Sequence, residues 1–405
     1  MSDTPSSLPH RLAAIAGRFG RATDPRMRAL EQTLANWARG DALPRYEETW
    51  QALVARVLTQ PHWLSLLFPH REAEFPELLP LIQSLSSISL VPGPRGADAL
   101  NARATWIREQ SDLHDPGSLI SSLLRDLQEN DPAEGPSFQF LSRYYGLLDL
   151  LVAHFVAPDL LPLHDRIFTT LHLQRTHWPH SYCSGYLYQG WEELGLCGIK
   201  PTDERLRGYD MVSTLSPTDR VLDLGANNGF LALALSRHVA QVDAVELNPF
   251  LIDIGRSSAQ HLGRDNVRFI LADIESWAPE VPYDAVFSLA NHSTIDQRMK
   301  MDFETYIAKL FAALKPGGWL FFESHNVFGP GTGGPGDDGD LDQKFDIVEG
   351  YFELIDAAMH RIFVPAHDVD KLFIKLRRRP GHAPGVKRSF SLEKARSRYA
   401  RGAAG

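Results

Sequence analysis

The sequence predicts an α/β fold over residues 220–380, preceded by an all-α domain over residues 1–180. In the C-terminal part, short apolar runs ending in an acid or a glycine turn alternate with helix-like segments, as in a parallel sheet. In the N-terminal part, apolar residues recur at helical spacing, for example in Trp50-Leu53-Val54-Val57-Leu58. At 405 residues the chain is long enough for both domains.

A glycine turn follows the first predicted strand, in the run Arg220-Val-Leu-Asp-Leu-Gly-Ala-Asn-Asn-Gly-Phe230. Gly225 allows a sharp turn at the end of the strand, and we expect Gly229 to let a ligand approach the backbone. The next strand ends in Glu246, which lies 21 positions after Gly225. At that distance a strand-helix-strand unit returns an acid that binds a ribose diol.

The spacing Asp223-x-Gly225-x-Asn227-x-Gly229 distinguishes between nucleotide cofactors. It departs from the Gly-x-Gly-x-x-Gly pattern of nicotinamide enzymes. An acid two residues before the first glycine would repel a pyrophosphate, whereas it suits the ammonium group of a zwitterionic ligand. The pattern therefore favours S-adenosylmethionine (SAM). Asn227 replaces a glycine, and asparagine also tolerates left-handed turn geometry.

Two further strands are expected at residues 266–274 and 283–290. Residues 314–323 are expected to hold a helix end, a Pro-Gly-Gly turn and then a fifth strand. With these five elements in order, residues 200–379 resemble the class I SAM-dependent methyltransferases. The resemblance implies a Rossmann-like, seven-stranded sheet with helices on both faces, closed by an antiparallel pair at residues 352–364 and 370–379. It also implies SAM as cofactor, bound by Asp223, Gly225, Asn227, Gly229, Glu246, Asp273, Ile274 and Leu289, with Asp273 near the adenine amino group.

Residues 181–219 form an aromatic-rich bridge that ends in a short helix expected to cover the cofactor. Tyr188, Arg205 and Tyr209 are placed to close the pocket, and Arg205 to pair with the cofactor carboxylate. The alternative is that Arg205 is a solvated helix charge and that the tyrosines pack at a domain interface.

Catalytic groups are expected after the fourth and fifth strands, because ligands bind at the carboxyl edge of an open sheet. His292 follows one of these strands, and Glu323 and His325 end the other. We predict a general base at His325 first and at His292 second, with Glu323 either orienting a histidine or binding substrate. Because a base is needed when the acceptor loses a proton, the histidines favour O-methylation of a small-molecule or sugar hydroxyl.

The glycine-rich run of residues 327–340 is expected to be a mobile loop over the acceptor. Its aspartates permit magnesium, but no companion ligand pattern accompanies them, so no metal site is predicted. The basic tail, residues 381–405, is predicted to be disordered.

The net charge and the cysteine content limit the classes of partner and the cellular compartment that we expect. The formal net charge is −9, and residues 181–380 hold 19 basic and 29 acidic residues, which argues against a nucleic-acid partner. No apolar stretch approaches the ~18 residues of a membrane span. Cys183 and Cys197 form no disulfide framework, and we expect thiols in a reducing cytoplasm. A homodimer is left open, as are two alternatives: a tRNA or RNA methyltransferase, and a non-catalytic SAM-binding scaffold.

Overall fold

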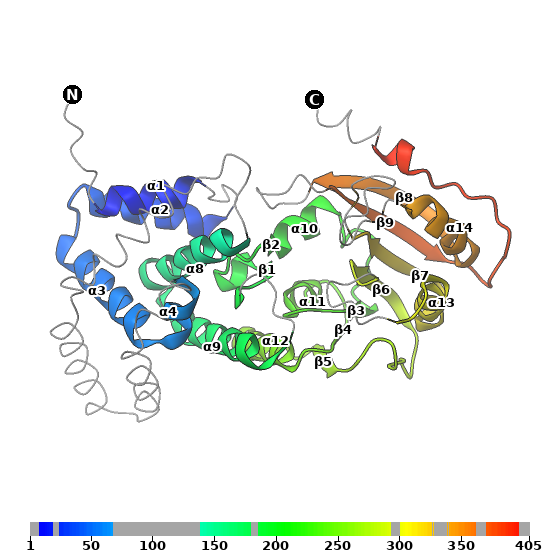
Figure 1. Cartoon of the computed structure of the whole chain (residues 1–405), viewed down its shortest axis with the longest axis horizontal. Coiled ribbons are helices and arrows are strands. Elements are labelled where there is room, and N and C mark those ends of the chain that lie inside the picture. The colour runs from blue at the N-terminus through cyan, green and yellow to red at the C-terminus, as the bar shows by residue number, and fades with distance from the viewer. Residues whose placement is uncertain are drawn as a thin grey trace. The chain divides into compact units, whose positions relative to one another are not determined.

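The computed structural model describes residues 8–18, 24–67, 138–179, 185–292, 300–325, 327, 338, 340–361 and 370–396. The chain divides into two compact units, Met1–Ile199 and Lys200–Gly405, which Figure 1 colours from blue to green and from green to red. The boundary falls inside the bridge predicted at residues 181–219.

The first unit is helical in its described part, as predicted. Its elements are α1 (Leu8–Arg18), α2 (Pro25–Ala38), α3 (Leu43–Thr59), α4 (Pro61–Leu67), α8 (Phe138–Phe155), η2 (Pro158–Leu160), α9 (Leu161–His177), β1 (Gln189–Gly190) and η4 (Glu192–Leu194). Aromatic rings fill its core: Trp63 lies 4.1 Å from Phe168 between ring centroids. Asp149 is buried in α8 and accepts hydrogen bonds from the Tyr186 hydroxyl and from the backbone of Cys197. These bonds tie the segment after residue 185 to the helices.

Within the described ranges, no single helix is long and apolar enough to cross a membrane. One bent pair of segments, Gln139–Phe155 with Pro158–His177, meets the test by length and composition only.

The second unit is built on a seven-stranded sheet with the order β5-β4-β3-β6-β7-β9-β8. Its elements are β2 (Lys200–Pro201), α10 (Thr202–Gly208), β3 (Arg220–Leu224), α11 (Phe230–Leu235), β4 (Gln241–Glu246), α12 (Pro249–Leu262), β5 (Val267–Leu271), β6 (Tyr283–Leu289), α13 (Phe303–Ala313), β7 (Leu314–Glu323), α14 (Leu341–Tyr351), β8 (Phe352–Arg361) and β9 (Asp370–Arg378). Strands β3 to β7 run parallel, and β9 pairs antiparallel with both β7 and β8. The predicted sheet and its closing pair are confirmed.

Successive strand residues alternate between two apolar clusters on opposite sides of the sheet. One cluster holds Val221, Val242, Phe287, Phe321 and Phe373 together with residues of α11. The other holds Leu222, Val245, Val286, Leu320 and Ile374 together with residues of α13 and α14. By this alternation Asp223, Glu246 and Glu323 belong to the α11 side of the sheet.

The prediction of a disordered tail is wrong for residues 381–396. The ring of Phe390 stacks on Phe345 of α14 at 4.0 Å between centroids. The backbone amides of Ser389 and Phe390 donate to the carboxylate of Glu349. The prediction relied on the basic composition of the tail and did not take account of Phe390 and Leu392, which are buried. Residues 397–405 lie outside the described residues.

Candidate cofactor site and sheet edge

The loop from β3 to α11 has three residues in the left-handed region. The φ angles of Gly225, Asn227 and Gly229 are +70°, +55° and +76°. Glycine adopts this region at little cost and asparagine tolerates it, so the expected turn geometry is confirmed. A Cβ on Gly225 would lie 2.2 Å from Oδ1 of Asn291, whose amide donates to the carbonyl of Leu224. The turn is therefore packed tightly against the end of β6.

Gly229 also packs closely against a neighbouring strand. A Cβ on this residue would lie 2.4 Å from Cε1 of Phe269 in β5. The glycine is therefore needed for its positive φ and for helix α11 to begin against that ring.

Glu246 is fixed at the end of β4 by backbone donors. Its Oε2 accepts from the amide of Asn227, and its Oε1 accepts from the amides of Leu247 and Asn248, each at 2.9 Å. These bonds hold the carboxylate beside the glycine loop.

Asp223 is the buried acid of the site, with 3% of its surface exposed. Among the described residues its Oδ2 has no hydrogen-bond partner. Burial raises the pKa of Asp223 to about 7; the charge of Arg205 acts to lower it, and that of Glu246 to raise it. A buried carboxyl oxygen without a donor is costly, and an ammonium group would satisfy it. The residues present thus fit the zwitterionic end of SAM.

The remaining residues predicted to bind or cover the cofactor lie in several other segments of the chain. Asp273 is exposed, and its Oδ1 accepts from the amide of Glu275. Ile274 and Leu289 are half-buried at the ends of their segments. Tyr209 is buried and stacks on Phe373 at 4.3 Å between ring centroids. Tyr188 belongs to the first unit.

Glu323 is the centre of an ion cluster, and its expected part in orienting a histidine or binding substrate stays a prediction. Its Oε1 lies 2.7 Å from Nζ of Lys200 and 3.2 Å from Nζ of Lys371, and its Oε2 lies 3.3 Å from Nη2 of Arg205. Burial opposes ionisation of Glu323, but the three cations hold its pKa well below the usual range. Arg205 is only 3% exposed, so its reading as a solvated helix charge is wrong.

The two candidate bases follow the ends of paired strands. Leu289 of β6 is in register with Glu323 of β7, so His292 and His325 both come just past the same edge of the sheet. The backbone amide of His325, which is buried, donates to the carboxylate of Asp338. His292 lies on the α13 side, with its ring 4.9 Å from that of Phe303.

The protonation of His292 is set by its surroundings. Burial lowers its pKa, and the charge of Lys344 lowers it further, while Asp338 and Asp340 act in the opposite direction. The imidazole is therefore neutral at neutral pH, the form that accepts a proton. Residues 326, 328–337 and 339 of the expected acceptor loop lie outside the described residues.

Residues 221–318 match the family model of a methyltransferase domain. Over these residues the second unit is similar to a methyltransferase domain. This confirms the resemblance over this part of the chain and, with it, SAM as the expected methyl donor.

Curated relatives match over short segments. Protein-L-isoaspartate O-methyltransferase of Roseiflexus castenholzii is 40% identical over 73 residues, 18% of this chain and 34% of the relative. Ubiquinone biosynthesis O-methyltransferase of Coxiella burnetii is 33% identical over 109 residues, 26% of this chain and 43% of the relative. The chain thus spans between a third and a half of the length of these relatives.

Solved structures are similar at low identity. The [4+2]-cyclase SpnF covers 53% of this chain and 94% of its own, with 16% identity and a TM-score of 0.39. The N-methyltransferase NodS from Bradyrhizobium japonicum covers 44% of this chain and 96% of its own, with 17% identity and a TM-score of 0.36.

Two residues near this domain's sheet edge, Lys200 and Lys371, were not indicated by any sequence motif. Lys200 is the first lysine of the chain, and the lack of lysine before it was attributed to compositional bias. Lys371 lies in β9 directly opposite His360 of β8. Neither belongs to a local motif, because the partners come from distant segments.

Proposed function

We propose that the chain is a SAM-dependent methyltransferase that methylates a hydroxyl group of a small molecule. The observation that carries the proposal is the buried carboxyl group of Asp223, one oxygen of which has no hydrogen-bond donor among the described residues. Asp223 lies two residues before Gly225 of the glycine loop, and the charge of Glu246 acts on it. Its position at the carboxyl end of a central parallel strand is where this class of sheet binds ligands.

In this proposal each end of the cofactor has its own protein group. Asp223 accepts from the ammonium, Glu246 accepts from the ribose hydroxyls, and Asp273 lies near the adenine. Arg205 pairs with the cofactor carboxylate, since its charge already acts on Asp223. When bound, SAM supplies a methyl group on a sulfonium, an electrophile that needs only in-line alignment.

A histidine is the proposed base, His325 first and His292 second. Bound SAM would supply the methyl group to the acceptor oxygen, and its sulfur would keep the electron pair of the broken carbon–sulfur bond. The hydroxyl proton passes to the imidazole, which must be neutral beforehand, as the lowered pKa of His292 provides. Two relatives whose names specify O-methyl transfer support an oxygen acceptor.

The experiment is to measure S-adenosylhomocysteine (SAH) release by the purified chain with SAM plus a metabolite extract, with SAM plus RNA, and with SAM alone. Release that depends on the metabolite extract supports the proposal. Release with RNA would replace it by RNA methylation, and SAM binding without release in any mixture would indicate a scaffold. Asp223→Ala should abolish release, while Asp253→Asn, which changes an exposed acid of α12, should leave it unaltered.

A further inference from the structure

Four charged side chains are buried together at the carboxyl edge of the sheet. Lys200, Arg205, Glu323 and Lys371 are between 1% and 4% exposed. Glu323 ends β7, and Lys371 is the second residue of β9, which starts at the same edge because it runs antiparallel to β7. Lys200 lies in β2, two residues before the start of α10, and Arg205 lies within α10. Burying four charges is costly unless their number and geometry are matched.

Lys200 is not fully matched. Its ammonium carries three hydrogens, and among the described residues its one hydrogen-bond partner is Oε1 of Glu323 at 2.7 Å. Two donors of a side chain that is 2% exposed are thus without an acceptor there. Such donors are expensive to bury unless a ligand accepts from them.

The electrostatic surroundings of Lys200 also call for an anion. Burial lowers its pKa well below the usual range, and both Arg205 and Lys371 lower it further, while Glu323 acts to raise it. Glu323 is shared among three cations, with both of its oxygens engaged. Within this set of four side chains, one carboxylate faces three positive charges.

The backbones that carry the cluster lie to one side of Asp223 in the sheet. In the sheet order, β6 separates β7 from β3, and β9 lies one strand further out. At about 4.8 Å per strand, the backbone of Glu323 is on the order of 10 Å and that of Lys371 on the order of 14 Å across the sheet from Asp223. A cofactor whose ammonium is held by Asp223 thus leaves the strands on this side of the sheet for a second ligand.

Aromatic groups border the cluster near Lys371. His360 of β8 lies opposite Lys371 and is half-buried. Its ring is edge-on to Tyr209 at 4.7 Å, and Tyr209 in turn stacks on Phe373 of β9. Flat apolar surfaces beside buried cations suit an organic acid better than an inorganic ion.

We propose that the methyl acceptor is a hydroxy acid whose carboxylate binds the ammonium groups of Lys200 and Lys371. This rests on the proposed function, because it assigns the second substrate of the same site. A carboxylate would accept the unfilled donors of Lys200 and offset the positive charge shared around Glu323. The same contacts would hold the hydroxyl of the acid in a fixed direction from the sheet edge.

Benzoate and its neutral counterpart benzamide test the proposal by calorimetry on the full chain saturated with SAH, so that the cofactor's own carboxylate site is filled. We expect benzoate to bind with millimolar affinity and benzamide at least about tenfold more weakly. Lys200→Met should weaken benzoate binding by about tenfold or more, as expected for a lost charge-assisted hydrogen bond. Lys371→Met should act in the same direction.

The matched control is Lys375→Met. Lys375 lies four residues along β9 from Lys371 on the same face of the strand, but its ammonium pairs with Asp210 at 2.8 Å. Its replacement should change benzoate binding by less than about twofold. SAH affinity and the thermal midpoint report whether each variant is folded; if Lys200→Met is not, Lys371→Met carries the comparison.

Each contrary result has a distinct meaning. Equal binding of benzoate and benzamide to the SAH-saturated wild type, or no binding of either, would overturn the carboxylate proposal and leave the methyltransferase proposal standing. A tenfold loss of SAH affinity in Lys200→Met with benzoate binding unaltered would reassign the cluster to the cofactor. Failure of the wild type to bind SAH would instead overturn the proposed function itself.

Discussion

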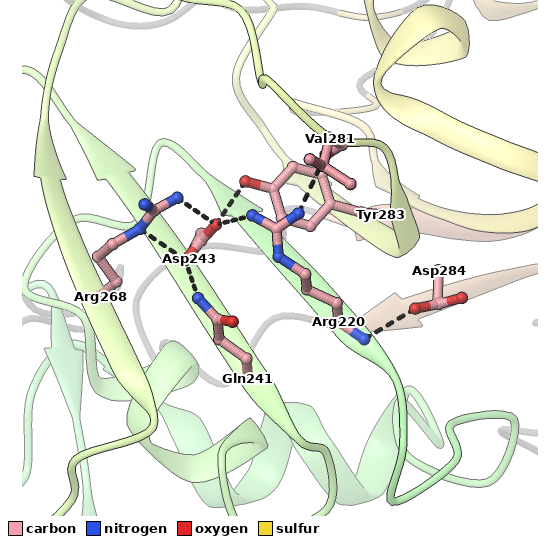
Figure 2. A network of polar contacts seen from close by, with 7 residues as sticks. All are labelled: Arg220, Gln241, Asp243, Arg268, Val281, Tyr283 and Asp284. Atoms are coloured by element: carbon pink, nitrogen blue, oxygen red, sulfur yellow. Dashed lines mark hydrogen bonds and ion pairs between the residues drawn. The ribbon is translucent and has the colours of Figure 1, made fainter.

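The hydroxyl of Tyr283 in β6 donates a 2.6 Å hydrogen bond to Oδ2 of Asp243 in β4, across the intervening strand β3. Figure 2 shows that Arg220 and Arg268 point at the same carboxylate from β3 and β5, and Gln241 from β4 itself. The Arg220 guanidinium also lies 4.5 Å from the centre of the Tyr283 ring. One buried acid thus joins four neighbouring strands.

Asp243→Asn should lower the free energy of unfolding by about 2 to 4 kcal/mol, because two arginines lose a buried anionic partner. Burial opposes ionisation of Asp243, yet the hydrogen bonds from Arg268 and Tyr283 hold its pKa below the usual range. Urea denaturation measures the change. Asp253→Asn, which removes an exposed pair with Arg256 at 3.9 Å, should alter stability by under about 0.5 kcal/mol. Equal effects of the two changes would contradict this account.

Asp223→Asn should stabilise the protein at neutral pH while weakening cofactor binding. The pKa of Asp223 is raised to about 7 in the folded chain, so the folded state binds this proton more tightly than the unfolded state. The wild type therefore loses stability as pH rises from about 4 to 7. The introduced asparagine does not titrate, so the variant keeps its stability over this range. The unfolding free energy of the variant minus that of the wild type should therefore grow by about 1 to 3 kcal/mol between pH 5 and pH 8. An advantage that shrinks with pH would refute the assignment.

SAM affinity should rise with pH up to about pH 7. An ammonium bound at Asp223 requires the ionised carboxylate, so below its pKa of about 7 binding releases a proton and affinity falls by up to about tenfold per unit. Calorimetry at pH 5.5, 6.5 and 7.5 in buffers of different ionisation enthalpy measures both quantities. Asp223→Asn should bind more weakly and lose the proton release. An unchanged proton release in that variant would assign it to another group.

Glu246→Ala should weaken SAM binding by about 1 to 3 kcal/mol through loss of charge-assisted bonds to the ribose. It also removes the acceptor of the Asn227, Leu247 and Asn248 amides, so loop order changes too. Glu246→Gln keeps an acceptor oxygen and serves as the comparison. Calorimetry should place it between wild type and Glu246→Ala; unaltered affinity in both variants would remove Glu246 from the cofactor site.

Replacing a general base should reduce turnover by about 10² to 10⁴ and leave SAM binding intact. We expect this of His325→Ala first and of His292→Ala second. His292→Phe is a useful companion, because it preserves the ring contact with Phe303 while removing the base. Measuring SAH formation under single-turnover conditions separates the rate of methyl transfer from the rate of product release. Full activity of all three variants would indicate an acceptor that needs no deprotonation.

Local sequence patterns predicted the sheet and the first half of the cofactor site. Strand periodicity, the glycine turn and the returning acid lie within about 27 residues of chain, from Arg220 to Glu246, and depend on backbone preferences that act over a few positions. The left-handed Asn227 and the position of Glu246 at a strand end follow from such preferences. The resemblance to the class I methyltransferases also implied the closing strands near residues 352 and 370.

Tertiary structure alone decided which distant charges meet. Glu323 was read as the neighbour of a histidine because they are close in sequence, but its partners are Lys200, Arg205 and Lys371, which come from other segments. Gly229 likewise leaves room for the ring of Phe269, which lies 40 positions later in the sequence. Sheet register and strand order bring these groups together, and neither is encoded in the spacing of any single segment, because cross-strand pairing is set by packing over the whole sheet.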